Sequence, residues 1–167
     1  MSTSTFSTEQ LFSLLNTIPD PEVPAISIVE LGVVRDINYA GDVLEIKITP
    51  TYSGCPAMKV MEEEIEKKLH EHQITNYKIR TILSPAWTTD WLSDSTKRKL
   101  KEYGIAPPEQ STASHLENLL NGKRKNVTCP FCSSTDTKLT SAFGSTACKA
   151  LHYCNACQQP FEEFKCH

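Results

Sequence analysis

The first third of the chain changes between two hydrophobic periods, that of a helix and that of a strand. Over residues 8–18, apolar side chains recur at the helical spacing. We place the N-cap of this helix at Thr8 and its end before Pro19, since a proline and the residue before it avoid the helix interior. Apolar and polar residues then alternate over 33–39 and 43–49. The short turn between these two segments predicts a β-hairpin with one buried face.

A charged amphipathic helix is predicted next, over residues 56–71. It carries one apolar stripe, and its many glutamates and lysines are best interpreted as a solvated face. A strand over 76–83 follows, and the order strand–helix–strand predicts a right-handed crossover within one sheet. A short basic helix over 95–103 completes this part. The elements predict an α+β fold in which helices cover a small mixed sheet.

Charge and cysteine content both change near residue 123. Residues 1–122 hold 11 Lys and Arg against 17 Asp and Glu, a net charge of −6, and residues 123–167 hold 6 against 3, a net charge of +3; together these give the −3 of the whole chain. Of the seven cysteines, six follow this point. We therefore expect three segments, namely an α/β domain at 1–106, a linker at 107–126 and a small module at 127–167.

The composition also bears on location and on the class of chemistry. No run of 18 apolar residues occurs, so we expect no contact with a membrane. The N-terminus lacks a basic region followed by an apolar core, so it is not a secretory signal, and we expect a cytoplasmic protein. Cysteines in such a protein favour metal or thiol chemistry over disulfides. Within the linker, a short helix is expected over residues 115–120.

Two Cys-x-x-Cys knuckles form the most specific motif. Cys129 and Cys132 are followed by Cys154 and Cys157, with 21 residues between the knuckles. This spacing predicts a tetrahedral four-thiolate site on a zinc ribbon, with a β-hairpin between the knuckles. Structural zinc is the leading assignment, and iron of the rubredoxin type stays open. The remaining candidate ligands of this module are Cys148, Cys166, His152 and His167.

A single cysteine lies in the first segment, within Thr51-Tyr52-Ser53-Gly54-Cys55-Pro56. Proline suits the first position of a helix, so Cys55 falls at or beside the N-cap of the helix over 56–71. There the unpaired backbone N–H groups and the positive end of the helix dipole favour a thiolate. The alternative is a small buried residue in a tight turn, since free cysteine is often buried.

Two further loops belong to the same part of the chain. Asp20-Pro21-Glu22 places two carboxylates in a stiff segment, which is either a plain turn or part of a site. The segment 84–91 contains both tryptophans. It follows a strand that we expect to run parallel to 43–49, so it leaves the same sheet edge as Thr51–Pro56. Ligand crevices of open α/β sheets form at such edges.

Several motifs together resemble known families. Residues 8–105 resemble the MIP18-like family of iron–sulfur assembly proteins, through D-P-E-V-P at 20–24, S-I-V-E-L-G-V-V at 27–34, T-Y-S-G-C-P at 51–56 and P-A-W at 85–87. The C-terminal module is similar to the ribbon of the PaaD family of phenylacetyl-CoA epoxidase systems, through C-P-F-C at 129–132, S-A-F-G-S-T-A-C-K-A-L at 141–151, C-N-A-C at 154–157 and P-F-E-E-F-K-C-H at 160–167.

The resemblance implies an accessory role in maturation and no enzyme activity of the chain itself. Its partner would be the oxygenase or the reductase subunit of that system. The positions that match the family motif are Asp20, Glu22, Thr51 and Cys55, and Cys55 would contact iron or a transient iron–sulfur cluster. One thiolate cannot hold a cluster alone, so a homodimer, a partner, or Cys148 or Cys166 would supply further ligands.

Two alternative functions stay open at this point, and a third is not expected. The chain could be a structural docking subunit of the oxygenase with an inert Cys55. It could be an electron-transfer protein with iron in the four-cysteine site. Nucleic-acid binding is not expected, because the net charge of +3 over residues 123–167 is modest and no basic stripe is interleaved with aromatic residues.

Overall fold

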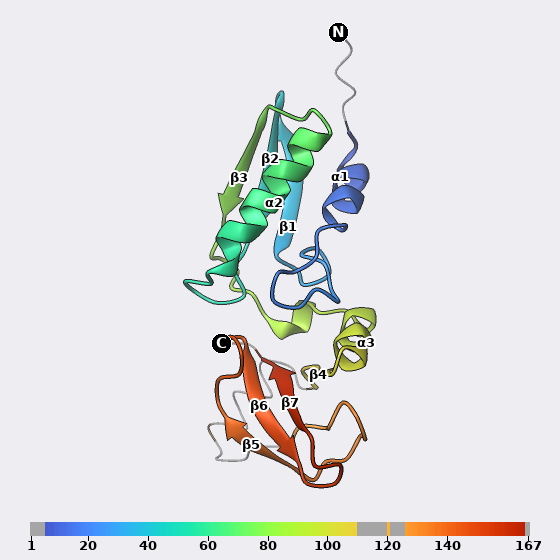
Figure 1. The fold of residues 1–167 in the computed structure, drawn as a ribbon. Coiled ribbons are helices and arrows are strands. Elements are labelled where there is room, and N and C mark those ends of the chain that lie inside the picture. Colours follow the sequence, from blue (N-terminus) through green and yellow to red (C-terminus); the bar gives the residue numbers. More distant parts are fainter. Residues whose placement is uncertain (1–5, 110–119, 121–125, 166–167) are drawn as a thin grey trace. The chain divides into compact units, whose positions relative to one another are not determined.

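The computed structural model describes residues 6–109, 120 and 126–165. The chain divides into two compact units, 1–87 and 88–167. Small sheets and helices alternate along the chain (Figure 1), so the predicted α+β class with a ribbon module is confirmed. The helix expected over 115–120 lies outside the described residues, apart from Leu120. Among the described helices, none combines the length and the apolar character needed to cross a bilayer.

Helix α1 spans Thr8–Leu15, and its N-cap is Ser7. The Ser7 hydroxyl accepts the backbone N–H of Gln10 at 3.2 Å, and the Gln10 side chain accepts the backbone N–H of Ser7 at 2.8 Å. This reciprocal capping box satisfies two N–H groups that a helix start leaves unpaired. The prediction of Thr8 as the N-cap is therefore wrong by one residue, because Ser7 and Gln10 have the spacing that the box requires.

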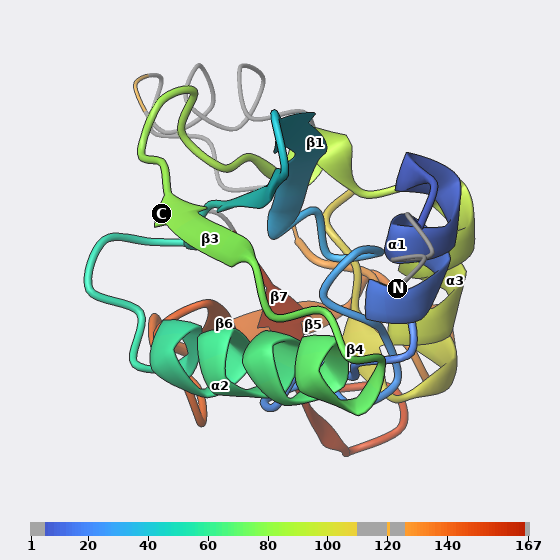
Figure 2. The same ribbon diagram turned by 90° about the horizontal axis from the view of Figure 1, so that it is seen from above.

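The first unit is built on a three-stranded sheet in the order β1-β2-β3. Strands β1 (Val34–Ala40) and β2 (Val43–Ile48) pair antiparallel, and β2 and β3 (Tyr77–Thr81) pair parallel. Helix α2 (Ala57–Glu71) connects the two parallel strands and lies along one face of the sheet (Figures 1 and 2). The core comprises alternate residues of β2 and one stripe of α2, namely Leu44, Ile46, Ile48, Met61, Ile65 and Leu69.

Strand directions bring three loops to one edge of this sheet. Val34 pairs with Ile48, and Ile48 pairs with Thr81, so the start of β1 lies beside the ends of β2 and β3. The segments 16–33, 49–56 and 82–87 therefore meet at this edge, which we call the loop edge. The shared edge that the sequence predicted for Thr51–Pro56 and the segment 84–91 is thus confirmed for the residues up to Trp87, and Thr88 begins the second unit.

Hydrogen bonds fasten the three segments of the loop edge to one another. The Thr49 N–H donates to the Val33 carbonyl at 2.9 Å, and the Ile82 N–H donates to the Ile48 carbonyl at 2.8 Å. The indole Nε1–H of the buried Trp87 donates to the Leu31 carbonyl at 2.9 Å. One tryptophan thus closes the core of the first unit.

The second unit holds a four-stranded sheet in the order β4-β7-β6-β5. A 3-10 turn η1 (Thr89–Trp91) and helix α3 (Asp94–Glu102) precede the strands. The strands are β4 (Ile105–Ala106), β5 (Thr137–Ser141), β6 (Lys149–Cys154) and β7 (Pro160–Phe164).

Strands β5 and β6 form the hairpin expected between the two knuckles, and β4 pairs parallel with β7. Residues 105–106 therefore belong to the sheet of the ribbon. The domain limits at residues 106 and 127 stay a prediction.

Candidate functional site

Cys55 lies at the loop edge, immediately before helix α2. Pro56 is the N-cap residue of α2 and Ala57 is its first helical residue. Cys55 is therefore beside the N-cap, as predicted. Pro56 itself was expected to be the first helical residue, and the helix begins one residue later. The Cys55 N–H donates to the Tyr52 carbonyl at 3.2 Å, and the Cys55 carbonyl accepts the Met58 N–H at 3.3 Å. The cysteine is 9% exposed. Its thiol is thus held close to the helix start and just beneath the surface.

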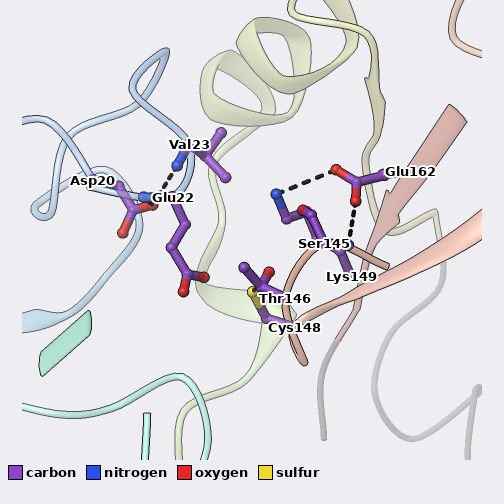
Figure 3. A network of polar contacts seen from close by, with 8 residues as sticks. All are labelled: Asp20, Glu22, Val23, Ser145, Thr146, Cys148, Lys149 and Glu162. Carbon is purple, nitrogen blue, oxygen red and sulfur yellow. Dashed lines mark hydrogen bonds and ion pairs between the residues drawn. The ribbon is translucent and has the colours of Figure 1, made fainter. Parts of the chain in front are cut away.

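Asp20 lies in the segment before β1 and shapes its own loop. One carboxylate oxygen, Oδ1, accepts the backbone N–H of Glu22 at 3.0 Å and that of Val23 at 2.6 Å (Figure 3). The backbone N–H of Asp20 donates to the Ile26 carbonyl at 2.8 Å, and the residue is only 3% exposed. Asp20 therefore makes an Asx turn that fixes the backbone of Glu22, which is half-buried.

Two threonines follow strand β2 at the same edge. Thr51, a predicted site residue, is buried. Thr49 is 1% exposed, and within the described part of the chain its hydroxyl has no hydrogen-bond partner. An unsatisfied buried polar group costs about 1–3 kcal/mol. Thr49 was not singled out from the sequence, because the alternation of β2 carries no sign that its hydroxyl lacks a partner.

The loop edge does not form a complete metal site by itself. A metal site needs several Cys, His, Asp or Glu side chains whose ligand atoms lie close together. Among the described residues, such a group, with all ligand atoms within 4.8 Å of one another, is formed by the ribbon cysteines. Cys55, Asp20, Glu22 and Thr51 share one edge of the sheet, and their roles stay predictions. Because Cys55 belongs to no such group among the described residues, an ion held there would need further ligands.

The ribbon cysteines, in contrast, converge on one point. The Sγ atoms of Cys129 and Cys157 are 3.7 Å apart, and those of Cys132 and Cys154 are 3.6 Å apart. Four sulfurs at tetrahedral corners, about 2.3 Å from a zinc ion, lie about 3.8 Å from one another. The observed spacing therefore fits a zinc ion bound by all four thiolates.

The two knuckles share two backbone features. The residue after each second cysteine, Ser133 or Gln158, has a positive φ of 61° or 60°. In the first knuckle the Cys129 N–H donates to the Ser134 carbonyl at 2.9 Å, and in the second the Cys154 N–H donates to the Gln159 carbonyl at 3.0 Å. Sequence reasoning missed these left-handed residues, because neither is glycine or asparagine.

The surroundings shift the pKa values of two of these thiols in opposite directions. A hydrogen bond from the backbone N–H of Cys157 lowers the pKa of the Cys154 thiol to about 7. Partial burial raises the pKa of Cys157 to about 12. Without metal, the group thus holds thiol protons at neutral pH, and binding of zinc must release them because the ligands are thiolates.

The other candidate ligands of the module have different partners. His152 Nε2 lies 2.9 Å from a carboxylate oxygen of Glu163, and its ring stacks on Phe161 at a centroid distance of 5.4 Å. Cys148 is buried, with its Sγ 3.1 Å from the Thr146 hydroxyl (Figure 3). Neither side chain joins the four-cysteine group. Cys166 and His167 lie outside the described residues.

Comparison with known families divides the chain into two matched parts. Residues 8–74 match a family described as iron–sulfur cluster assembly protein, and residues 113–165 match the PaaD zinc β-ribbon domain. The first matched segment contains Asp20, Glu22, Thr51 and Cys55. The second contains the four converging cysteines, which supports zinc as the metal of that site.

Two curated relatives match different lengths of the chain. A protein of Escherichia coli (strain K12), named as a subunit of 1,2-phenylacetyl-CoA epoxidase, is 43% identical over 158 residues, 94% of this chain and 92% of that protein. The Fe-S protein maturation auxiliary factor YitW of Bacillus subtilis (strain 168) is 31% identical over 91 residues, 53% of this chain and 88% of that protein.

Among solved structures, a domain of unknown function from Bacillus anthracis has a TM-score of 0.50 at 25% identity, over 55% of this chain and 89% of that one. A conserved hypothetical protein from Thermotoga maritima has a TM-score of 0.50 at 22% identity, over 60% of this chain and 98% of that one, and supports the fold alone. With the predicted motifs, the metal geometry and the near full-length match in agreement, the chain belongs to the PaaD family of 1,2-phenylacetyl-CoA epoxidase systems.

Proposed function

We propose that this chain is a maturation factor for a metal centre of a phenylacetyl-CoA epoxidase system, and that it handles iron or an iron–sulfur cluster through Cys55. Family membership supports an accessory role in that system, and the match to a relative named as an Fe–S maturation factor supports the type of role. The observation that carries the proposal is the loop edge, where the D-P-E, T-Y-S-G-C-P and P-A-W segments meet.

The chemistry of this edge suits ligand exchange. Cys55 lies immediately before Pro56, the N-cap residue of α2, and its sulfur is a soft ligand of the kind that iron–sulfur clusters take. The thiolate would replace one ligand of the incoming iron, and a ligand of the client protein would later replace the thiolate. Glu22 and Thr51 add oxygen atoms at the same edge, and Asp20 fixes the backbone that carries Glu22.

The cargo needs ligands that this edge does not provide. Iron–sulfur clusters usually take four protein ligands, and Cys55 contributes one. We infer that the oxygenase or reductase subunit, or a second copy of the chain, supplies the others while the cargo is in transit. A site that is complete only in such a complex releases its cargo when the complex separates.

The ribbon has a different role in this proposal. Four thiolates close the coordination of zinc, so the ion has no open position for substrate and acts in folding. The second unit has a small core, and zinc binding would supply much of its stability. In this proposal the ribbon therefore supports the fold and takes no part in the transfer of cargo.

Reconstitution tests the role of Cys55. The zinc-loaded protein is supplied with ferrous iron and sulfide and then incubated with the metal-free oxygenase or reductase, and metal transfer and recovered activity are measured. Cys55→Ser should abolish transfer, whereas the control Cys148→Ser, at a buried cysteine of the second unit, should retain it. Unchanged transfer by Cys55→Ser, together with a stable stoichiometric complex, would instead favour a docking subunit with an inert cysteine.

A further inference from the structure

Residues 104–106 lie between the two matched families. The assembly-family match ends at residue 74, and the ribbon match begins at residue 113. In the structure, Ile105 of β4 pairs with Glu162 of β7, and Ala106 pairs with Glu163 (Figure 1). We call Gly104 to Ala106 the 104–106 segment. Its pairing with β7 brings it to the zinc ribbon.

Ala106 shares a buried cluster with two of the cysteines that would hold the zinc ion. It is 1% exposed, and the cluster also contains Cys129, Cys154 and Phe161. Cys129 and Cys154 belong to different knuckles, and both are fully buried. Protein interiors are close-packed, so a displacement of β4 would disturb the packing of both knuckles.

Gly104 lies against an aromatic ring of the first knuckle. Its φ is +90°, a backbone conformation that glycine adopts at little cost. A Cβ at residue 104 would lie 3.1 Å from Cε1 and 3.3 Å from Cζ of Phe131, which is closer than ordinary van der Waals contact. Phe131 stands between the ligands Cys129 and Cys132, so a shift of its ring strains the backbone that carries both.

A polar contact joins the end of α3 to the same knuckle. Nζ of Lys101, in the last turn of α3, donates to the Ser133 hydroxyl at 3.4 Å. The backbone N–H of Ser133 donates to the Cys129 carbonyl at 3.0 Å. The contact of Lys101 is long and exposed, so we assign it little energy. The packing of Gly104 and Ala106 is therefore the main link between the 104–106 segment and the knuckles.

We propose that the 104–106 segment slows the loss of zinc from the four cysteines, and that zinc in turn keeps the segment paired with β7. The two effects belong together, because coupling between a bound ion and a conformation is reciprocal. Gly104 and Ala106 are positioning residues, since they act through Phe131 and the packed cysteines and bind no metal themselves. This inference does not depend on the role of Cys55.

The rate of zinc release from the loaded full chain tests the effect on the metal. The chromogenic chelator pyridylazoresorcinol is added in excess, and the absorbance of its zinc complex gives the rate. Gly104→Ala should release zinc about threefold faster or more, within the range of coupling between residues in contact. The matched control is Gly41→Ala in the first unit, where φ is also positive, at +64°, and no atom lies within 4 Å of an added Cβ. The control should release zinc at the rate of the unaltered chain.

A second variant separates the contact with Phe131 from backbone strain at residue 104. Phe131→Ala removes a ring that is 51% exposed, so this variant should fold and load with zinc, which its metal content verifies. In this background, Gly104→Ala should change the release rate less than in the unaltered chain, because the added Cβ no longer meets the ring. Equal effects in the two backgrounds would overturn the proposal. So would a Gly104→Ala rate equal to that of the unaltered chain or of Gly41→Ala.

Hydrogen exchange of the unaltered chain tests the effect of zinc on the segment. Zinc is removed with EDTA, and deuterium uptake is followed by mass spectrometry. A peptide that spans residues 103–109 should exchange faster without zinc, whereas a peptide from β2 should exchange equally in both states. Unchanged exchange over 103–109 would contradict the coupling. An equal rise in the β2 peptide would also contradict it, since the response would then be general unfolding.

Discussion

The two cysteine regions of the molecule differ in how many thiols meet. In the ribbon, four sulfurs lie within 4.8 Å of one another, and two knuckles with shared backbone features hold them. At the loop edge, Cys55 belongs to no such group among the described residues, and no atom lies within 4 Å of a Cβ placed on the neighbouring Gly54. The ribbon site is complete without a partner, whereas the loop edge is not.

The difference teaches that cysteine count alone does not reveal function. A closed four-thiolate site keeps its metal and stabilises a fold. A single cysteine lacks the further ligands that clusters usually take, which suits the transfer of cargo that we propose for Cys55. The more specific motif, the pair of Cys-x-x-Cys knuckles, thus marks the structural site. The less specific motif, around Cys55, marks the candidate functional site.

The largest effect should follow removal of the ribbon metal. Cys154→Ser leaves three thiolates, and structural zinc binding is worth about 10–16 kcal/mol in small zinc modules. Dispersed amide signals of residues 127–165 should be lost in a two-dimensional NMR spectrum, while those of residues 6–87 stay in place. A folded second unit in metal-free protein would show that the ribbon core is sufficient and would break the comparison.

Replacement of Cys55 should impair metal transfer and leave the fold nearly unchanged. Cys55→Ser should abolish metal transfer to the client but change the free energy of unfolding by no more than about 1–2 kcal/mol, as expected for one buried thiol. Zinc content, measured by atomic absorption, should stay at one ion per chain. Loss of zinc from this variant would show that the two cysteine regions are not independent.

Asp20 separates a positioning role from a ligand role. Asp20→Ala removes the acceptor of two backbone N–H bonds and should destabilise the first unit by about 1–2 kcal/mol and impair transfer. Asp20→Asn retains an oxygen for both bonds, so stability and transfer should be largely restored. Chemical denaturation and the reconstitution assay give the two readouts. Failure of Asp20→Asn in transfer alone would identify the carboxylate as a ligand.

The smallest expected effect concerns Thr49. Thr49→Val removes a buried hydroxyl without a partner in the described residues, so the free energy of unfolding should rise by up to about 1 kcal/mol. If the hydroxyl completes its hydrogen bonding with cargo at the loop edge, the same variant should transfer metal less well. A stabilised variant with unchanged transfer would exclude Thr49 from the site.

Much of this architecture could be predicted from sequence, because it depends on local signals. The periods of β2 and α2 predicted the sheet and its covering helix, and the parallel pairing of β2 and β3 placed the loops at one edge. The Cys-x-x-Cys spacing predicted the four-thiolate group. In each case, the residues that form the sequence pattern are the same residues that make the contacts in the structure.

Features that arise from tertiary contacts could not be predicted in this way. The two-residue strand β4 gains its pairing from β7, more than fifty residues later in the chain. The unpartnered Thr49 hydroxyl and the positive φ of Ser133 and Gln158 depend on their surroundings, not on residue type. The hydrogen bond from the backbone N–H of Glu22 to Asp20 Oδ1 could likewise not be predicted, although the D-P-E motif marked Asp20 as a candidate site residue.

The pairing of β4 with β7 implies an order of events during synthesis. Domains generally fold as units, N-terminal ones first, so we expect the first unit to fold before the second has been synthesised. Strand β4 emerges soon afterwards, but its partner β7 ends at Phe164, and the second knuckle lies just before that strand. The sheet of the second unit and its zinc site must therefore wait for this later segment. A nascent chain would thus expose a finished Cys55 edge before it possesses the ribbon.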